Sequence, residues 1–489
     1  MEQVLNHAFY DQLPLSLRKV MLILEEAGYE AYVVGGACRD FLLGRAPHDF
    51  DLCTSATPDE VTALFDGRDG TYKVEPTGRE YGTVTIITDC DKPHEEVGVY
   101  EITTFRGDSY KGLDHTDCEV AFTKSLEEDL ARRDFTINAI VYSVKEKSFF
   151  DYFGGISDMA VNLLRCVTSP KMSFRQDPLR MLRGVRFMAV LADKNNNAFR
   201  LAEDAEAFIS KNAALIRYMS AERIQQELNK LLAGQFVADA LRMMLKVGLM
   251  DIILPEVAIQ SRLQHNNPYH KDYWDESRTV FDHVIDVVKD VEPLYPLRLA
   301  ALLHDIGKID SIHVKDAGYW AFYGHPEQSA RMAKDILARL KYSIADTDFI
   351  TKLVLWHDDP ITVDLKISRK LVKKMMNRFD GNLEVIRQYL NLKHADAVHH
   401  HPYKGKNACY LAAIEQCFPM VKEIIEAKEA FSIKDLVING EDVKEALQIK
   451  PGPVVGASLR MVLEKVIEET LPNEKTALIQ CIKEAYGRG

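Results

Sequence analysis

Near its N-terminus the chain reads Val33-Val34-Gly35-Gly36-Ala37-Cys38-Arg39-Asp40, and this run is followed closely by Asp49-Phe50-Asp51-Leu52. The first run has the pattern of a strand, a tight turn and the start of a helix. Adjacent glycines let the backbone approach a ligand, and the N–H groups of a helix start attract an anion. Arg39 would add a charge-assisted contact to a phosphate. A Gly-Gly pair taken alone is more often a plain structural turn.

The second run carries two carboxylates. Residues i and i+2 of a strand project from the same face, so Asp49 and Asp51 are predicted to lie side by side. They would repel each other unless a cation lay between them, and Mg²⁺ combines a few carboxylates with phosphate oxygens. An isolated Asp-x-Asp is more often a polar strand edge, but next to a phosphate-binding turn it indicates two-metal nucleotidyl transfer.

The run from Gly35 to Gly44, followed by residues 49–54, resembles the signature of the class II nucleotidyltransferases. That family contains bacterial tRNA CCA-adding enzymes and poly(A) polymerases, built on a polymerase-β-like head. The resemblance implies that Asp49 and Asp51 are catalytic ligands of Mg²⁺. It also implies a third catalytic carboxylate on a neighbouring strand, where Glu101 stands; a salt-bridged strand glutamate is the alternative.

Two further segments, 127–139 and 174–187, resemble family motifs that bind the nucleotide. Arginine suits phosphate oxygens, whereas Asp and Asn suit ribose hydroxyls. The nucleotide-binding residues implied by these motifs and by the glycine turn are Gly35, Gly36, Arg39, Arg132, Arg133, Asp134, Asn138, Asp177, Arg180, Arg183 and Arg186.

The second of these segments is expected to select the base. Pro178 suits the first position of a helix, so Asp177 is predicted to cap it. The resemblance implies that Asp177 accepts from the amino group of cytosine or adenine while Arg180 donates to the adjacent ring nitrogen. The family commonly has Glu before this Asp. Here Gln176 can only hydrogen-bond, which leaves the positioning of Arg180 open.

Histidine is concentrated in the second half of the chain, where 11 of 15 lie after residue 264. His304-Asp305 closes an apolar helix that Gly307 is predicted to end. The order His283, His304-Asp305, Asp396 resembles the HD phosphohydrolase domain, and His325 and His357 resemble the extra ligands of its two-metal members. Each histidine alone is more often a core or surface residue. The set predicts a divalent metal: Mn²⁺, Ni²⁺, Fe²⁺ or Mg²⁺.

Composition is that of a globular protein, with 489 residues, 47% hydrophobic and 27% charged. The net charge of −12 argues against a nucleic-acid partner. Basic residues are nevertheless clustered, with six basic and one acidic residue at 165–186 and six basic and no acidic residues at 366–378. The second cluster is either a solvated helix face or a contact with RNA phosphates.

The eight cysteines form no Cys-x-x-Cys pair, the N-terminus has no secretory pattern, and no apolar run approaches the roughly 20 residues that span a bilayer. We therefore expect a cytoplasmic protein without membrane contact. β-like runs at 31–34, 50–53, 83–88 and 97–105 precede helical patterns such as 178–191 and 221–232. The expected fold is α+β: a small mixed sheet with helices, then a mainly α-helical body including the HD domain.

The predicted domains are a nucleotidyltransferase head at 1–154, a helical neck binding RNA and nucleotide at 155–262, an HD domain at 263–404 and a helical tail at 405–489. Breaks are expected near 255–268 and 401–406. The hypothesis is an enzyme that adds C, C and A to the tRNA 3′ end from CTP and ATP, with an HD-domain phosphohydrolase activity. The alternatives are a poly(A) polymerase of this family and an HD-type nucleotide phosphohydrolase whose head only binds nucleotide. The sequence predicts no oligomeric state.

Overall fold

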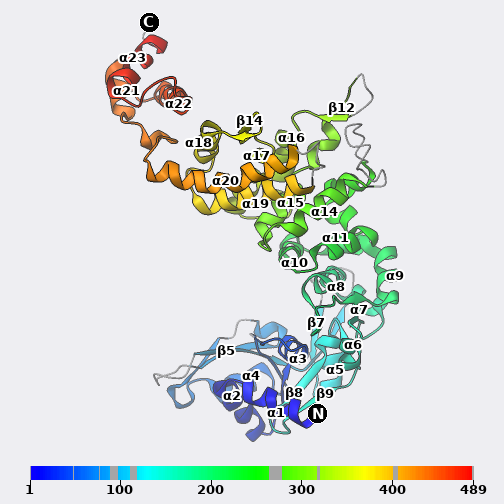
Figure 1. The fold of residues 1–489 in the computed structure, drawn as a ribbon. Coiled ribbons are helices and arrows are strands. Elements are labelled where there is room, and N and C mark those ends of the chain that lie inside the picture. The colour runs from blue at the N-terminus through cyan, green and yellow to red at the C-terminus, as the bar shows by residue number, and fades with distance from the viewer. Residues whose placement is uncertain are drawn as a thin grey trace. The chain divides into compact units, whose positions relative to one another are not determined.

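A computed structural model describes residues 2–47, 49–75, 78–88, 97–110, 118–263, 278–315, 320–399 and 406–486. The chain divides into two compact units, Met1–Pro255 and Glu256–Gly489 (Figure 1). The four predicted domains are a finer division and stay a prediction. The predicted breaks near 255–268 and 401–406 reach into segments 264–277 and 400–405, which lie outside the described residues.

The first unit is built on a seven-stranded mixed sheet in the order β3-β4-β5-β2-β1-β8-β9. Within it β2 and β5 run parallel and the other neighbours run antiparallel. The strands are β1 Ala31–Val34, β2 Asp51–Thr54, β3 Tyr72–Glu75, β4 Thr83–Thr88, β5 Gly98–Thr104, β8 Ile140–Ser143 and β9 Ser148–Asp151. A separate hairpin joins β6 Arg106–Tyr110 to β7 Cys118–Phe122.

Helices pack around this sheet and continue into the rest of the unit. They are α1 Glu2–Gln12, α2 Leu15–Glu26, α3 Gly36–Leu42, α4 Pro58–Phe65, α5 Leu126–Ala131, α6 Gly155–Ala160, α7 Pro170–Gln176, α8 Leu179–Val190, α9 Glu203–Asn212, α10 Ala221–Leu232, α11 Val237–Lys246, α12 Met250–Ile253 and, crossing the unit boundary, α13 Pro255–Ala258. A core beneath the turn after β1 includes Val34, Cys53 and Val141 from three neighbouring strands. This packing fixes the ends of β1 and β2, where the predicted catalytic residues lie.

The second unit is mainly helical, as the sequence predicts. Its helices are α14 Val280–Asp290, α15 Tyr295–Leu303, α16 His325–Arg339, α17 Ile344–Trp356, α18 Arg369–Arg378, α19 Leu383–His399, α20 Lys406–Glu426, α21 Gly440–Leu447, α22 Pro453–Ile467 and α23 Lys475–Tyr486. Two short hairpins, β12 Ile312–Val314 with β13 Trp320–Phe322 and β14 Thr362–Val363 with β15 Lys366–Ile367, complete it. No helix in the described part of the chain is long and apolar enough to cross a membrane.

Several predicted elements coincide with the structure. The strand at 31–34, the strand at 83–88 and the helix at 221–232 have the predicted bounds, and the elements predicted at 50–53, 97–105 and 178–191 differ by one residue at each end. The predicted α+β class with a mainly helical body is confirmed.

Candidate active site

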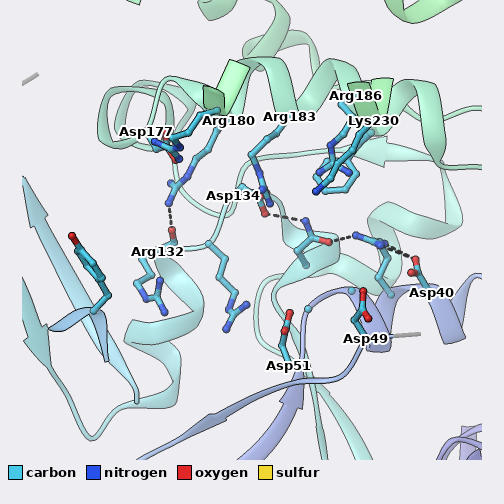
Figure 2. Close-up of a pocket in the computed structure, with 18 of the residues that line it drawn as sticks. Asp40, Asp49, Asp51, Arg132, Asp134, Asp177, Arg180, Arg183, Arg186 and Lys230 are labelled. Carbon is cyan, nitrogen blue, oxygen red and sulfur yellow. Dashed lines mark hydrogen bonds and ion pairs between the residues drawn. The ribbon is translucent and has the colours of Figure 1, made fainter. Parts of the chain in front are cut away.

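A cavity of about 800 Å³ in the first unit gathers most of the predicted site residues (Figure 2). Its wall includes the glycine turn before α3, the β2 carboxylates, the residues that follow α5, and one face each of α8 and α10. The predicted residues that line it are Gly35, Gly36, Arg39, Asp49, Asp51, Arg132, Arg133, Asp134, Asn138, Asp177, Arg180, Arg183 and Arg186. Glu101 is not among the lining residues.

The carboxylates lie where β2 begins. Asp51 is the first residue of β2, and Asp49 precedes the strand, so the predicted placement of both within one strand is wrong. Both nevertheless line the cavity. Glu101 lies on β5, which pairs with β2 through Leu52 and Ile102. Loss of hydration raises the pKa of Asp51; Arg133 opposes the rise, and Glu101 and Asp49 add to it. Mutually repelling carboxylates of this kind fit a divalent cation.

The turn before α3 requires glycine at its first position. Gly35 has a φ of +77°, and a Cβ atom there would lie 3.6 Å from Nη1 of Arg133 and 4.0 Å from Oδ2 of Asp51. The backbone therefore comes close to both a cation and a metal-ligand carboxylate, which is the placement expected for a phosphate-binding turn.

Arg132 and Arg133 are held by a carboxylate that the sequence reasoning missed. The fully buried Asp129 on α5 accepts from Nε and Nη2 of Arg132 at 3.0 and 2.7 Å and from Nη2 of Arg133 at 3.3 Å. It also accepts from the backbone N–H of Arg106. The spacing of three and four residues to two adjacent arginines was a signal for this pairing on a helix.

A continuous polar network links the motifs. Arg39 donates to Oδ1 of Asn138 at 2.7 Å, Asn138 donates to Asp134 at 2.9 Å, and Arg183 donates twice to Asp134 at 2.6 and 2.9 Å (Figure 2). Burial acts to raise the pKa of Asp134, but Arg183 overrides it and holds that pKa well below its usual range. Asp134 and Asn138 thus position arginines in the nucleotide-free protein.

The two predicted base-selecting residues lie together at the junction of α7 and α8. Oδ1 of Asp177 accepts from the backbone N–H of Leu179 at 3.1 Å, which is the capping contact expected for this residue. Arg180 is buried, and its Nη1 donates to the hydroxyl of Ser173 at 3.1 Å and to Gln176 at 3.5 Å. Its Nη2 donates to the carbonyl oxygen of Arg132. Hydroxyl and carbonyl oxygens therefore hold the Arg180 guanidinium, with Gln176 at the limit of hydrogen-bond distance.

Helix α10 contributes three residues that were not predicted. Arg223 and Lys230 line the cavity, and Glu227 forms ion pairs with Arg186 at 2.6 Å and Arg183 at 3.7 Å. The three side chains recur at positions i, i+4 and i+7, so they share one face of the helix. That spacing of charged residues was a readable signal.

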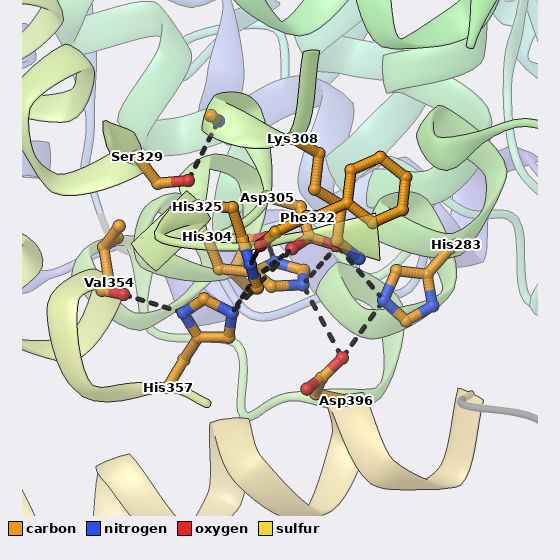
Figure 3. Close-up of polar contacts among 12 residues, drawn as sticks. His283, His304, Asp305, Lys308, Phe322, His325, Ser329, Val354, His357 and Asp396 are labelled. Carbon is orange, nitrogen blue, oxygen red and sulfur yellow. Dashed lines mark hydrogen bonds and ion pairs between the residues drawn. The ribbon is translucent and has the colours of Figure 1, made fainter. Parts of the chain in front are cut away.

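A second cluster lies in the other unit, where His283, His304, Asp305, His325, His357 and Asp396 converge (Figure 3). Two groups share Asp305: His283, His304 and Asp305, then Asp305, His325 and His357. The ligand atoms of each group lie within 4.8 Å of one another. Asp396 adds Oδ1 at 3.1 Å from Nε2 of His283. All six predicted residues are therefore brought together and buried.

The ring nitrogens show which atoms are left for a cation. Nδ1 of His304, His325 and His357 lies 2.7, 2.8 and 2.7 Å from the carbonyl oxygens of Ala301, Phe322 and Val354, respectively. A carbonyl only accepts, so each Nδ1 donates a proton to it and each Nε2 is turned inward. Nε2 of His325 and Nε2 of His357 are 3.2 Å apart.

These inward atoms fit a divalent metal. Among the described residues, Nε2 of His304 and Oδ1 of Asp305 are buried without a hydrogen-bond partner. Burial lowers the pKa of His357 to about 3. Burial also opposes a proton on His304, but Asp305 and Asp396 raise its pKa to about 10. The cluster thus needs positive charge at its centre, and nitrogen with carboxylate donors suits Mn²⁺, Ni²⁺ or Fe²⁺.

Gly307 does not end the apolar helix, as was predicted, but has another structural role. The helix α15 ends at Leu303, and Gly307 lies inside the following short helical turn, Ile306–Ser311. A Cβ atom at Gly307 would lie 2.6 Å from the backbone nitrogen of Ser329 and 2.7 Å from the carbonyl oxygen of His325. The glycine therefore allows the segment after Asp305 to approach α16, which carries His325.

The basic cluster at 366–378 is mostly neutralised by acids of its own unit. Arg369 pairs with Glu429 at 2.6 Å and Glu423 at 3.2 Å. The other pairs are Lys370 with Glu469, Lys373 with Glu429, Lys374 with Glu468 and Arg378 with Asp359. Both predicted interpretations, a solvated face and an RNA contact, overlooked this internal pairing.

Comparison with known proteins links both units to one group of enzymes. Residues 31–165 match the Poly A polymerase head domain, 198–260 match the family described as probable RNA and SrmB-binding site of polymerase A, and 315–482 match tRNA nucleotidyltransferase domain 2 (putative). The chain is similar to several proteins named CCA-adding enzymes. The motifs at 35–54 and 127–139 fall within the first matched range, residues 31–165.

Individual relatives support that relationship. A CCA-adding enzyme of Geobacillus kaustophilus is 41% identical over 276 residues, which cover 55% of this chain and 62% of the relative. A match to the Geobacillus thermodenitrificans enzyme spans about half of that relative, 51%. A CCA-adding enzyme of Levilactobacillus brevis is 29% identical over 95% of this chain and 96% of its own.

A solved structure has the same overall fold. The crystal structure of the Bacillus stearothermophilus CCA-adding enzyme in complex with CTP matches with a TM-score of 0.65 and 26% identity, covering 96% of each chain. The similarity therefore extends beyond the head into the second unit.

Proposed function

We propose that this protein is a CCA-adding tRNA nucleotidyltransferase that uses CTP and ATP. The observation that carries the proposal is that the carboxylates Asp49 and Asp51 line the same cavity as the pair Asp177 and Arg180. Asp49 and Asp51 lie at the start of β2, and Asp177 and Arg180 lie at the start of α8. One cavity can therefore hold a nucleotide by its base and present its phosphates to the reaction centre.

The reaction is attack of the tRNA 3′-hydroxyl on the α-phosphate, with pyrophosphate as the leaving group. Asp49 and Asp51, with Glu101 on the neighbouring strand, would hold Mg²⁺, which when bound activates the hydroxyl and stabilises developing charge. The glycine turn and Arg39 bind phosphate oxygens, while Arg132 and Arg133, fixed by Asp129, add fixed positive charge.

Base selection follows from donors and acceptors. Cytosine and adenine both present an amino group beside a ring acceptor, which matches the Asp177 carboxylate and the Arg180 guanidinium. Uracil and guanine present the reverse order, so their carbonyl oxygen would face a carboxylate. A site with fixed polar groups rejects such a mismatch strongly. A poly(A) polymerase is the rival function, because the same pair accepts adenine.

Omission of single nucleotides tests the proposal. A tRNA that lacks its last three nucleotides is incubated with CTP, with ATP or with both, and the products are resolved to one nucleotide. We expect two additions with CTP alone, none with ATP alone and three with both. A ladder of added A with ATP alone would contradict the proposal and favour the poly(A) polymerase.

We propose a second activity for the histidine cluster, a metal-dependent hydrolysis of phosphate esters of the HD type. It is supported by the inward Nε2 atoms and by Asp305, whose two oxygens face different histidine groups. His283, His304, Asp305 and Asp396 would hold one metal ion, and Asp305, His325 and His357 would hold a second. When bound, they supply a hydroxide nucleophile and neutralise phosphate charge.

Metal analysis and a chromogenic phosphodiester test this second activity. The full chain is loaded with Mn²⁺ or Ni²⁺, and bound metal and hydrolysis of bis(p-nitrophenyl) phosphate are measured. His304→Ala and His357→Ala should each lose metal and hydrolysis while retaining CTP incorporation. His313→Ala, an exposed histidine outside the cluster, is the matched control. Hydrolysis that survives both cluster variants would contradict the proposal.

A further inference from the structure

Both oxygens of the Asp177 carboxylate are already occupied in the nucleotide-free protein. Oδ1 accepts from the backbone N–H of Leu179 at 3.1 Å, and Oδ2 accepts from Nη2 of Arg223 at 2.8 Å. Each carboxylate oxygen can accept about two hydrogen bonds, so each keeps a place for one more donor. The contacts therefore fix the direction of the carboxylate without using up its capacity.

Arg223 comes from α10, a helix that contacts α8 through a second charged residue. One turn after Arg223, Glu227 is buried and pairs with Arg183 and Arg186. The charges on this face of α10 are thus opposite to those that they meet on the α7–α8 segment. Arg223 pairs with Asp177, and Glu227 pairs with Arg183 and Arg186. This pattern sets the register of α10 against α8 at the base-reading end of the cavity.

We propose that Arg223 is the positioning residue that makes Asp177 selective for cytosine and adenine, an inference that rests on the proposed function. Arg223 holds one oxygen while the N–H of Leu179 holds the other, so the carboxylate cannot turn away from an unsuitable base. The buried Arg180 is fixed separately by Ser173 and the carbonyl oxygen of Arg132. Of the two base-reading groups, only Asp177 depends on Arg223.

The chemistry predicts which property changes when Arg223 is lost. With the carboxylate held, the O4 of uracil or the O6 of guanine would face a fixed acceptor, and these bases are rejected. A released carboxylate can rotate, so the repulsion against uracil disappears and the hydrogen bond to the cytosine amino group weakens. Selectivity should therefore fall much more than the rate of the chemical step, because the metal-ligand carboxylates are untouched.

The test compares kcat and KM for CTP and UTP at the first addition to tRNA lacking its last three nucleotides, using the full chain. Arg223→Met keeps the length of the side chain and removes its charge. We expect the CTP-to-UTP ratio of kcat/KM to fall by about 10-fold or more, as for loss of one good base contact. KM for CTP should rise, with kcat changed by less than about 3-fold.

Two variants separate positioning from folding. Arg223→Lys should restore part of the ratio, because an ammonium can still donate to Oδ2. Arg242→Met makes the same change on the exposed side of α11, where Arg242 pairs with Asp239 of its own helix, and should leave the ratio unchanged. Thermal midpoints of all variants are measured alongside, and because Arg223 is 44% exposed they should stay close to wild type.

Two outcomes would overturn the inference. One is a folded Arg223→Met protein with an unchanged ratio. The other is a lower KM for CTP at an unchanged ratio, which would mean that Arg223 blocks Asp177 until the nucleotide displaces it. Failure of the proposed function looks different, because the wild-type chain itself would then add no CTP.

Discussion

At the scale of single residues, the roles of neighbouring carboxylates differ according to their partners. Asp49 and Asp51 line the cavity, whereas Asp129 and Asp134 are buried against arginines. The sequence indicated the first pair through the Asp-x-Asp spacing. For Asp129 the signal was weaker, only its spacing of three and four residues to Arg132 and Arg133, because a carboxylate in a run of three acidic residues looks like an ordinary acidic first turn of a helix.

Asp51→Asn should abolish nucleotide addition. The amide keeps the volume but loses the charge that holds the cation, which costs several kcal/mol of transition-state stabilisation and about a 1000-fold drop in kcat. Single-turnover incorporation of labelled CTP measures the loss. Glu80→Gln on the exposed turn after Gly78 is a suitable control. Near-normal incorporation by Asp51→Asn would contradict the assignment of the metal site.

The Asp134–Arg183 pair should give a stability that depends on pH. The pKa of Asp134 is lower in the folded than in the unfolded protein, so the stabilisation is complete above the unfolded pKa of about 3.9 and is lost as the pH falls below it. Arg183→Met should lower the free energy of unfolding by roughly 2 kcal/mol at pH 7. The loss is smaller than for a fully buried pair because Arg183 is partly exposed.

Urea unfolding at pH 7, 5 and 3 measures this difference between wild type and Arg183→Met. We expect the difference in free energy of unfolding between wild type and Arg183→Met to be the same at pH 7 and pH 5 and smaller at pH 3. A gap that grows on acidification would show that the pair does not hold Asp134 in its charged form.

At the scale of elements, local sequence patterns predicted which segments form helices and strands but not which charges they exchange. The strands at 31–34 and 83–88 follow from their β-branched and alternating residues. The pairing of α18 with the acids of α20, α22 and their flanking residues could not be predicted, because it joins residues 54 to 99 positions apart. The role of Gly307 could not be predicted from the local sequence either. The glycine is needed for the close approach to a neighbouring helix, α16, and not for the end of the helix that precedes it.

The paired lysines of α18 should contribute little to RNA binding. Lys370 and Lys374 already pair with Glu469 and Glu468, so a phosphate contact would first have to break these pairs. Lys370→Met with Lys374→Met should change tRNA affinity by less than about 2-fold and leave the slope of log affinity against log salt unaltered.

Filter binding at several salt concentrations decides this point. If both lysines touched phosphates, the magnitude of the slope would fall by about 0.7 to 0.9 for each lost contact. Lys230→Met provides a comparison, because Lys230 lines the nucleotide cavity of the other unit.

At the scale of the whole molecule, an acidic net charge of −12 coexists with a cationic cavity. The overall charge disfavours indiscriminate binding of RNA, and the cavity concentrates arginines where a triphosphate would enter. The two units also carry two kinds of candidate metal site: oxygen donors in the first, and histidine with carboxylate in the second. Such donor sets favour different cations, so the two sites can be loaded independently.

We propose that one cavity adds C, C and A in order without a nucleic-acid template. To test this, all four nucleoside triphosphates are supplied at equal concentration to tRNA lacking its last three nucleotides, and the product 3′ ends are sequenced. Most molecules should gain C, C and A and stop. Runs of A, or incorporation of U or G at a frequency near that of C, would contradict it.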